Sequence, residues 1–426
     1  MKITYKGILD KAFEVLGIIT LPYIFILSII ANLGYYQKLF FRSLLILFVI
    51  WLVIGICKRK NITIPPIYRF IIAVTTIIVS TSSVSIYILQ RKGELHNPEW
   101  TYFVYVDAAV LLISMIIYVC KKELFDLGLR LTSLFVLLTG VWGYIDYIKL
   151  AFEYINKDRA YVLSYRPFSI YMNPIPAGQI FLMFLWIPFF MGKREPDKKE
   201  QIINAVIRTI VYVPFIILTK SRSIWLGLIL TAVVWFFIYR KSIVSGWKQL
   251  SVKKKYICAV LMAAIACVGI PAFIKVVIAR FTGLKAQQPY YLRLNYIRYT
   301  LEQYANSRLL RKIFGHGPGR SKDMITASPY FEPPYNICDN AYMSMLYEWG
   351  IIAIIAVFVI YIFAFRIVID SAKENRKSIA VYCAFAVIAC IIPIFFYEAQ
   401  MWFMVGTPMA IFIAGGVYKG MQQLHK

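Results

Sequence analysis

The residues of this sequence best placed for chemistry are arginines in apolar surroundings. Arg222 lies in the segment LTKSRSIWLG, where a tight hairpin leads directly into an apolar run. An ionisable side chain near a membrane either reaches out to the surface or serves a function, such as holding an anion. Lys220 can reach the surface easily, whereas for Arg222 we favour a function. Arg293 lies between two leucines, which indicates a buried or membrane-facing position.

A second candidate is the loop KIFGHGPGRSK, residues 312–322, in which three glycines alternate with His316 and Pro318. It fits neither the P-loop pattern nor the G-x-G-x-x-G dinucleotide pattern. Two interpretations stay open. The glycines could let the backbone approach a phosphate or sugar closely, or the loop could be a turn that folds this part of the chain back over a cavity. His316 could donate a hydrogen bond or titrate.

The surroundings of both candidates are basic and aromatic. Residues 280–338 carry nine basic and three acidic residues, a net charge of +6, together with nine tyrosines and phenylalanines between Tyr290 and Tyr335. Tyr296 lies three residues after Arg293, and Arg298 lies five after it, which is not close on one helix face. Positive charge with aromatic rings suits a sugar joined to a phosphate. For the aromatics alone, an amphipathic helix on lipid headgroups is the simpler interpretation.

Other polar residues lie at the ends of apolar runs. Asp339 and Asn340 precede one run and could cap its helix. Glu348 follows nine residues after Asp339, about half a turn out of phase, so the two do not form a carboxylate pair on one helix face. Arg166 precedes the start of another run, which is broken by Asn173 and the prolines after it. Irregular backbone at membrane depth lines a cavity or packs on protein.

The composition defines the class of protein that must position these residues. The chain has 426 residues, a mean hydropathy of +0.67 and 60% hydrophobic residues, which excludes an ordinary soluble domain. The net charge of +26 is better explained by cytoplasmic loops rich in Lys and Arg than by nucleic acid. The seven cysteines show no paired spacing and the three histidines are far apart, so neither disulfides nor a metal site are expected.

The apolar runs predict an all-α integral membrane protein with about twelve transmembrane helices. Their predicted ranges are 12–32, 40–57, 68–90, 100–120, 127–148, 168–192, 202–219, 222–239, 257–279, 339–365, 379–396 and 399–418. An even number places both termini on one side, which the distribution of Lys and Arg identifies as cytoplasmic. We therefore predict nine helices in residues 1–279, a large extracytoplasmic loop with helices over the active site in 280–338, and three helices in 339–426.

Several segments, in this order, resemble the O-antigen ligase and polymerase family, the Wzy and WaaL membrane glycosyltransferases. The segments are NPIPAG (Asn173 to Gly178), SRS (Ser221 to Ser223), the helix around Arg293, FGHGPG (Phe314 to Gly319) and DNAYMSMLYEWGII (Asp339 to Ile352). Each is weak alone, but their order and the predicted topology make the set fairly specific. The resemblance implies a GT-C-like fold in the bacterial plasma membrane, with the active site facing outside.

The resemblance also implies the reaction and its residues. The donor would be a glycan on undecaprenyl diphosphate, and Arg222 and Arg293 occupy the positions of the arginines that bind the diphosphate. A guanidinium can hold phosphate oxygens in two parallel hydrogen bonds and stabilise the negative charge that grows on the departing group. This leaving group is already activated, so neither a metal nor a cofactor is expected. The candidates for binding substrate are Arg166, Asn173, Lys220, Arg298, His316, Tyr296, Asn340 and Glu348.

One departure from the family bears on the reaction type. Ligases of the lipopolysaccharide type carry a His just before the Asn that opens the tenth helix, and here that residue is Asp339, as in many polymerases of the family. Asp339 could be a general base for an acceptor hydroxyl or a helix cap. We therefore favour a polymerase of repeat units over a ligase that uses another surface acceptor. A lipid-linked sugar transporter, a scaffolding role and the binding of a chain-length regulator stay open.

Overall fold

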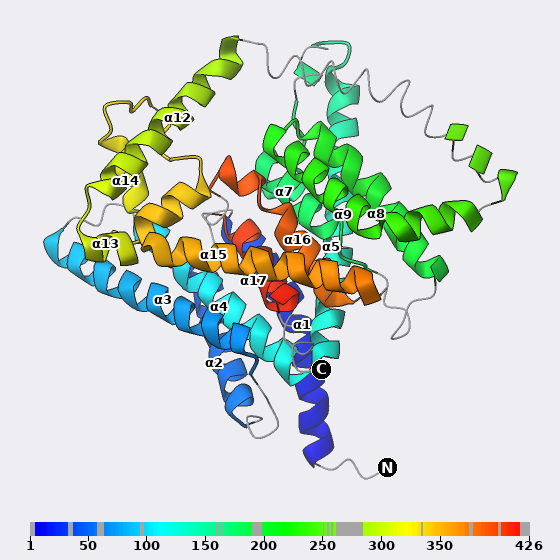
Figure 1. Cartoon of the computed structure of the whole chain (residues 1–426), viewed down its shortest axis with the longest axis horizontal. Helices are drawn as coiled ribbons and strands as arrows, with labels where there is room; N and C mark the ends of the chain where they lie inside the picture. The colour runs from blue at the N-terminus through cyan, green and yellow to red at the C-terminus, as the bar shows by residue number, and fades with distance from the viewer. Residues whose placement is uncertain are drawn as a thin grey trace.

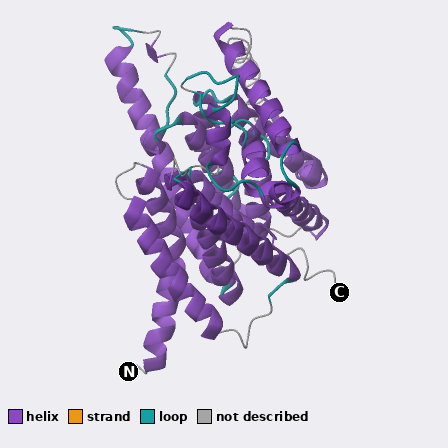
Figure 2. Ribbon diagram, turned by 90° about the vertical axis from the view of Figure 1, so that its left-hand side faces the viewer, coloured by secondary structure: helices purple, strands orange, loops and turns teal. Residues whose placement is uncertain are grey.

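The computed structural model describes residues 5–32, 37–57, 64–93, 98–158, 161–162, 165–189, 198–249, 251–253, 255–256, 259–260, 284–333, 335–374, 378–398 and 402–417. Within these ranges every regular element is a helix (Figure 2). The prediction of an all-α protein is therefore confirmed for the described part of the chain.

The helices fall into three groups along the sequence. The first group contains α1 (Tyr5–Asn32), α2 (Gln37–Cys57), α3 (Pro66–Lys92), α4 (Pro98–Cys120) and α5 (Lys122–Tyr154). The second contains η2 (Ser169–Tyr171), α7 (Pro174–Phe184), α8 (Lys198–Leu218) and α9 (Arg222–Gln249). The third contains α12 (Leu284–Ala305), α13 (Leu309–Phe314), α14 (Arg320–Thr326), α15 (Ala341–Glu374), α16 (Ile379–Ala389), η4 (Pro393–Phe395) and α17 (Phe403–Val417).

Several of these helices have the length and composition of membrane spans. Among the described residues, seven qualify: Asp10–Asn32, Gln37–Cys57, Pro66–Lys92, Tyr102–Cys120, Lys122–Tyr154, Arg222–Lys241 and Ala341–Ala372. Four more apolar helices are shorter, namely Pro174–Phe184, Ile202–Leu218, Ile379–Phe395 and Phe403–Val417. The chain is thus a multi-pass membrane protein. The predicted ninth span, 257–279, lies outside the described residues except for 259–260, so the predicted total of twelve stays a prediction.

Two predicted spans differ from the helices observed. The span predicted from 168 to 192 is helical only from Pro174 to Phe184, because Asn173 has an extended backbone and caps the helix there. The six residues before Pro174 contain η2 and the positive φ angles of Ser169 and Met172. The predicted span 339–365 continues to Glu374 in α15, but it is interrupted at Gly350, whose φ of 73° is not helical.

The shorter helices of the C-terminal part also depart from the prediction. The span predicted over 379–396 is helical in α16 only to Ala389, and a turn and η4 follow it. The last span was predicted from 399 and begins at Phe403. Hydropathy shows where the chain is apolar but not whether its backbone is helical. A helix predicted from hydropathy can therefore include apolar turns. The helix predicted around Arg293 is confirmed as α12, while the extracytoplasmic loop predicted over 280–338 stays a prediction.

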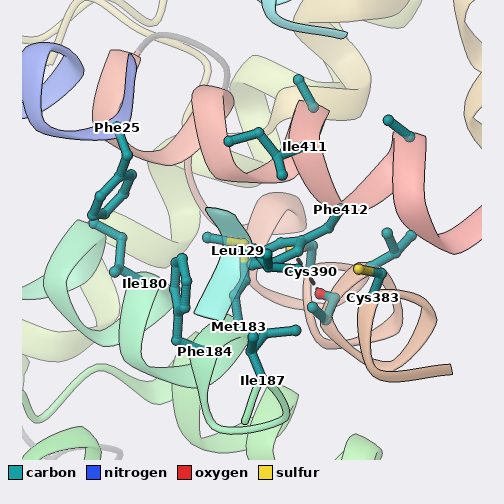
Figure 3. Packing of buried hydrophobic residues seen from close by; sticks show 14 of the residues in the cluster. Phe25, Leu129, Ile180, Met183, Phe184, Ile187, Cys383, Cys390, Ile411 and Phe412 are labelled. Carbon is teal, nitrogen blue, oxygen red and sulfur yellow. Dashed lines mark hydrogen bonds between the residues drawn. The ribbon is translucent and has the colours of Figure 1, made fainter. Parts of the chain in front are cut away.

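The core is assembled around α17. This helix packs against α1, α4, α7, α15 and α16. In Figure 3, Phe184 of α7 lies between Phe25 of α1 and Phe412 of α17, with ring centroids 5.6 Å and 5.1 Å apart. All three rings are buried. Aromatic pairs at these separations contribute about 0.5–1.5 kcal/mol beyond their buried area, so the first, second and third groups share one core.

The long helix α15 connects the loop helices to the rest of the bundle. It contacts α12, α13 and α14 near its start and also packs against α3, α9, α16 and α17. Figure 1 shows α12, α13 and α14 together on one side of the molecule and α7, α8 and α9 on the other, with α15 running between them. The predicted candidate residues lie on both of these sides.

Candidate functional site

An ion pair joins the loop helix α12 to the residue before the cap of α15. The Nη2 and Nε of Arg293 donate to Oδ2 of Asp339, at 2.8 Å and 3.2 Å. The side chains are 34% and 24% exposed, so the pair is reachable from solvent. A phosphate group can compete with Asp339 for the guanidinium, because each of the two anions can accept two parallel N–H bonds from it.

The backbone around Asp339 is specified locally. Asp339 has a φ of 51°, in the left-handed region that Asp and Asn tolerate better than most residues. Asn340 then caps α15, because its Oδ1 accepts the backbone N–H of Met343 at 3.1 Å. Of the two residues that the sequence offered as caps, Asn340 makes the capping bond and Asp339 binds Arg293. The side chain of Asp339 is thereby turned toward α12.

The other candidates on α12 have different surroundings. Tyr296 is 1% exposed, and its hydroxyl donates to the carbonyl of Tyr335 at 2.8 Å. It therefore ties the loop 335–340 to α12 next to Arg293. Arg298 points to solvent, with 76% of its side chain exposed, and pairs with Glu302 one turn along the helix. The structure thus brings Arg293, Tyr296, Asp339 and Asn340 together and leaves Arg298 on an exposed face.

A second basic group surrounds the hairpin between α8 and α9. Nε of Arg166 donates to the carbonyl of Thr219 at 2.6 Å, and Nζ of Lys220 donates to the carbonyl of Tyr165 at 3.0 Å. Lys220 has a φ of 51°, and Arg222 is the first residue of α9 and half-buried. Three cationic side chains are therefore gathered at the start of one helix, where the helix dipole also favours an anion.

Asn173 contributes to the same part of the fold as a cap. Its Oδ1 accepts the N–H of Ile175 at 2.9 Å, and Pro174 occupies the first helical position. A Cβ on Gly178, one turn further along α7, would lie 3.2 Å from the side-chain oxygen of Thr219. The NPIPAG segment thus fixes α7 against the α8–α9 hairpin, and in this structure the side-chain oxygen of Asn173 serves the backbone.

The glycine loop packs against the interruption in α15. The N–H groups of His316 and Gly317 donate to the carbonyls of Tyr347 and Glu348, at 2.9 Å and 3.0 Å. A Cβ on Gly315 would lie 2.1 Å from the carbonyl oxygen of Glu348. The glycines allow backbone to approach backbone here, so the loop closes onto α15. This is the arrangement expected of the turn interpretation, while contact of the loop with a ligand stays a prediction.

The side chains of His316 and Glu348 reinforce this closure. The His316 ring stacks on Tyr347 with centroids 4.1 Å apart, and its Nδ1 lies 3.1 Å from the Tyr347 carbonyl. Burial, with the nearby positive charges of Arg311 and Arg320, lowers the pKa of His316. Glu348 is 1% exposed and accepts from the backbone N–H and the hydroxyl of Ser321 at the start of α14.

One buried carboxyl near Asp339 was not among the candidates drawn from the sequence. Glu398 is 2% exposed, and its Oε1 accepts the backbone N–H of Cys338 at 3.1 Å and the hydroxyl of Ser344. The sequence pattern assigns Glu398 to a short turn between two apolar runs, where an interfacial side chain is the simplest interpretation. Only the fold places it beneath the residues on both sides of Asp339.

The two sides of the site are linked through η4. A Cβ on Gly227, in the second turn of α9, would lie 2.8 Å from the side chain of Pro393, the first residue of η4. The segment after η4 leads to Glu398, which contacts Cys338. Within the described residues, no group of three or more His, Cys, Asp or Glu side chains is arranged to hold a metal ion.

Comparison with protein families gives a match over the middle of the chain. Residues 209–358 match the O-antigen ligase family, a range that contains Arg222, Arg293, the glycine loop and Asp339. This match confirms the family resemblance that the sequence motifs indicated. It supports a glycosyltransferase activity of the O-antigen ligase and polymerase kind in a multi-pass membrane protein. No curated protein matches the chain.

Proposed function

Proceeding from the O-antigen ligase match, we propose that this chain polymerises oligosaccharide repeat units at the outer face of the bacterial plasma membrane. The donor is a glycan on undecaprenyl diphosphate, and the acceptor is a second lipid-linked repeat unit. Both termini are cytoplasmic in this proposal. The observation that carries it is the solvent-accessible pair of Arg293 and Asp339, in which a fixed cation and a carboxylate lie side by side.

The pair supplies the two functions that a single displacement requires. The acceptor hydroxyl oxygen attacks the anomeric carbon, and the bond from that carbon to the phosphate oxygen breaks. The electron pair leaves with the diphosphate, whose growing charge Arg293 and Arg222 stabilise. The carboxylate of Asp339 takes the proton of the acceptor hydroxyl. The configuration at the anomeric carbon is inverted, and no metal is used.

Binding of the donor prepares the base. In the structure the guanidinium of Arg293 is bound to Oδ2 of Asp339. A diphosphate that binds the guanidinium weakens that ion pair, because the carboxylate loses its partner to a group of higher charge. The oxygen of Asp339 that the guanidinium held is then available to the acceptor hydroxyl. Arg166, Lys220 and Asn173 hold the second side of the site in place around Arg222.

The runner-up is transfer of the glycan to a different surface acceptor, as in an O-antigen ligase. The family match itself carries the ligase description. The two reactions share the donor and the diphosphate site, and they differ in the acceptor. Asp339, at the position where lipopolysaccharide-type ligases carry a His, favours the polymerase.

The test uses purified protein in detergent with a synthetic repeat unit on undecaprenyl diphosphate. We expect a ladder of longer products for wild type, and no ladder for Arg222→Ala, Arg293→Ala or Asp339→Asn. Arg308→Ala is the matched control, since that side chain is exposed in the same basic segment and is not among the candidates. A single transfer that requires a separate acceptor would establish the ligase instead. Transport of the lipid across liposomes without any product would contradict both enzyme proposals.

A further inference from the structure

A buried acid lies beneath the proposed base. Glu398 follows η4, is 2% exposed, and has its second carboxyl oxygen, Oε2, shielded from solvent. Burying an ionised carboxyl without a cation is costly, so such a group generally keeps its proton or is paired with a positive charge. Among the described residues, the hydrogen bonds to Glu398 come from a backbone amide and a hydroxyl and not from a cation.

The contacts of Glu398 bracket Asp339 in the sequence. Its Oε1 accepts the N–H of Cys338, the residue before Asp339, and the hydroxyl of Ser344, in the first turn of α15. Asp339 itself has a φ of 51°. A residue in this sparsely populated region keeps its conformation only when the surrounding structure fixes it. Glu398 fixes the chain on both sides, through one oxygen atom.

The electrostatic surroundings favour the protonated form of Glu398. The pKa of Glu398 is raised to about 8, mainly by burial; the hydrogen bonds of Ser344 and Cys338 lower it, and the neighbouring carboxyls of Glu348 and Asp339 raise it. Arg293 of α12, a cation that lies beside this cluster, is bound to Asp339. With Arg293 paired to Asp339, the neighbouring buried carboxyl of Glu398 is accommodated most easily when it is neutral.

We infer that Glu398 is a positioning residue for Asp339, which it holds in place as an uncharged acid. The inference rests on the proposed function, because it assigns to Asp339 the role of base. A protonated Glu398 keeps its acceptor oxygen for Cys338 and Ser344 and adds no negative charge beside Asp339. When Glu398 loses its proton, a second negative charge lies next to Asp339. The ionised Glu398 then competes with Asp339 for the positive charge of Arg293.

The experiment measures kcat for polymerisation against pH in wild type, Glu398→Gln, Glu398→Ala and Ser344→Ala. Glutamine keeps the acceptor oxygen and cannot ionise, so kcat near pH 7 should stay close to wild type. The fall of kcat on the basic side, expected near pH 8 in wild type, should move up by roughly one pH unit or more. Glu398→Ala should lower kcat by about 100-fold, the cost of a displaced catalytic group. Ser344→Ala should lower it less.

The pH profile separates positioning from a role in folding alone. If Glu398 serves folding alone, Glu398→Ala should give less folded protein, and the fall of kcat at basic pH should be the same in Glu398→Gln as in wild type. An unchanged fall of kcat in Glu398→Gln would overturn the inference. Wild-type kcat in Glu398→Ala would overturn it as well. Infrared difference spectra provide a readout that needs no activity. The difference between the wild-type and Glu398→Gln spectra should contain the carbonyl band of one protonated carboxyl, and this difference band should disappear through about pH 8.

The infrared spectra also distinguish failure of the proposed function from failure of the inference on Glu398. If wild type shows no transfer but its protonated carboxyl titrates and is lost in Glu398→Gln, the proposed function fails and the buried acid stands without a catalytic role. If wild type polymerises and no such band is found, the proposed function stands and the inference on Glu398 is wrong.

Discussion

The closure of the glycine loop onto α15 can be tested with one methyl group. Gly315 has φ 79° and ψ −175°, a combination that only glycine adopts readily. A Cβ there would lie 2.1 Å from the carbonyl oxygen of Glu348, which is far inside the closest allowed contact. Gly315→Ala must therefore both strain its own backbone and push the loop away from α15.

The magnitude follows from what is lost. The backbone conformation costs about 1–3 kcal/mol for a residue with a side chain. Separation of the loop from α15 removes the hydrogen bonds from His316 to Tyr347 and from Gly317 to Glu348, each contributing about 1 kcal/mol. We expect Gly315→Ala to destabilise this region by about 3–5 kcal/mol.

Gly93 provides the matched control. Its φ is 69°, and a Cβ added there would meet nothing within 4 Å. Gly93→Ala should therefore cost only the intrinsic penalty of about 1–2 kcal/mol. The difference of about 2 kcal/mol corresponds to roughly a 30-fold change in an equilibrium constant.

The assay combines thermal unfolding in detergent with limited proteolysis of the 309–340 segment. Gly315→Ala should expose that segment to cleavage and lower the Tm more than Gly93→Ala does. Equal effects of the two substitutions would refute the argument, because they would show that backbone conformation alone matters and that close packing on α15 contributes nothing.

Three further predictions concern single side chains. Arg298→Ala should change the unfolding free energy by less than about 1 kcal/mol in a detergent melt, because its pair with Glu302 is exposed; a larger loss would mean that this side chain has another partner. Asn173→Ala should cost about 1 kcal/mol in the same melt through loss of the α7 cap, and Asn173→Ser should recover most of it. The pKa of Glu398 is raised from 4.5 to about 8, so its contribution to stability is complete below pH 4.5 and declines as the pH rises to about 8. Glu398→Gln should flatten that decline in a series of melts across pH, and an unchanged slope would contradict the assignment.

The sequence predicts the class of protein well and the local backbone less well. Apolar runs of about 20 residues require helices in a membrane, because lipid offers no hydrogen-bond partners to the backbone. Residues 168–173 belong to the same apolar run as the helix that follows, yet α7 begins only after Asn173, at Pro174. Likewise nothing in the hydropathy of α15 marks Gly350 as a break, although its φ is 73° and a Cβ there would lie 2.2 Å from the carbonyl oxygen of Ile313.

Part of the candidate site could be predicted from the sequence because charge in apolar surroundings is conspicuous. Arg293 and Asp339 are 46 positions apart, and the residues around each one indicate it as a candidate independently of the other. The structure shows the two side chains bonded. Glu398 was missed for the opposite reason. A single acidic residue in a short turn resembles a surface residue, and its burial depends on how the segment after η4 packs beneath Cys338.

The left-handed backbone of Asp339 restricts which residues can replace it. At a φ of 51°, side chains other than those of Gly, Asn, Asp and His are disfavoured, since these four are the residues found most often in that region. The family resemblance places His at this position in lipopolysaccharide-type ligases and Asp in this chain, and both belong to that short set. An exchange between the two therefore alters the proton-accepting group while the main chain keeps its course. Variation between ligases and polymerases at this position can thus proceed by one substitution, without rebuilding the loop that presents it.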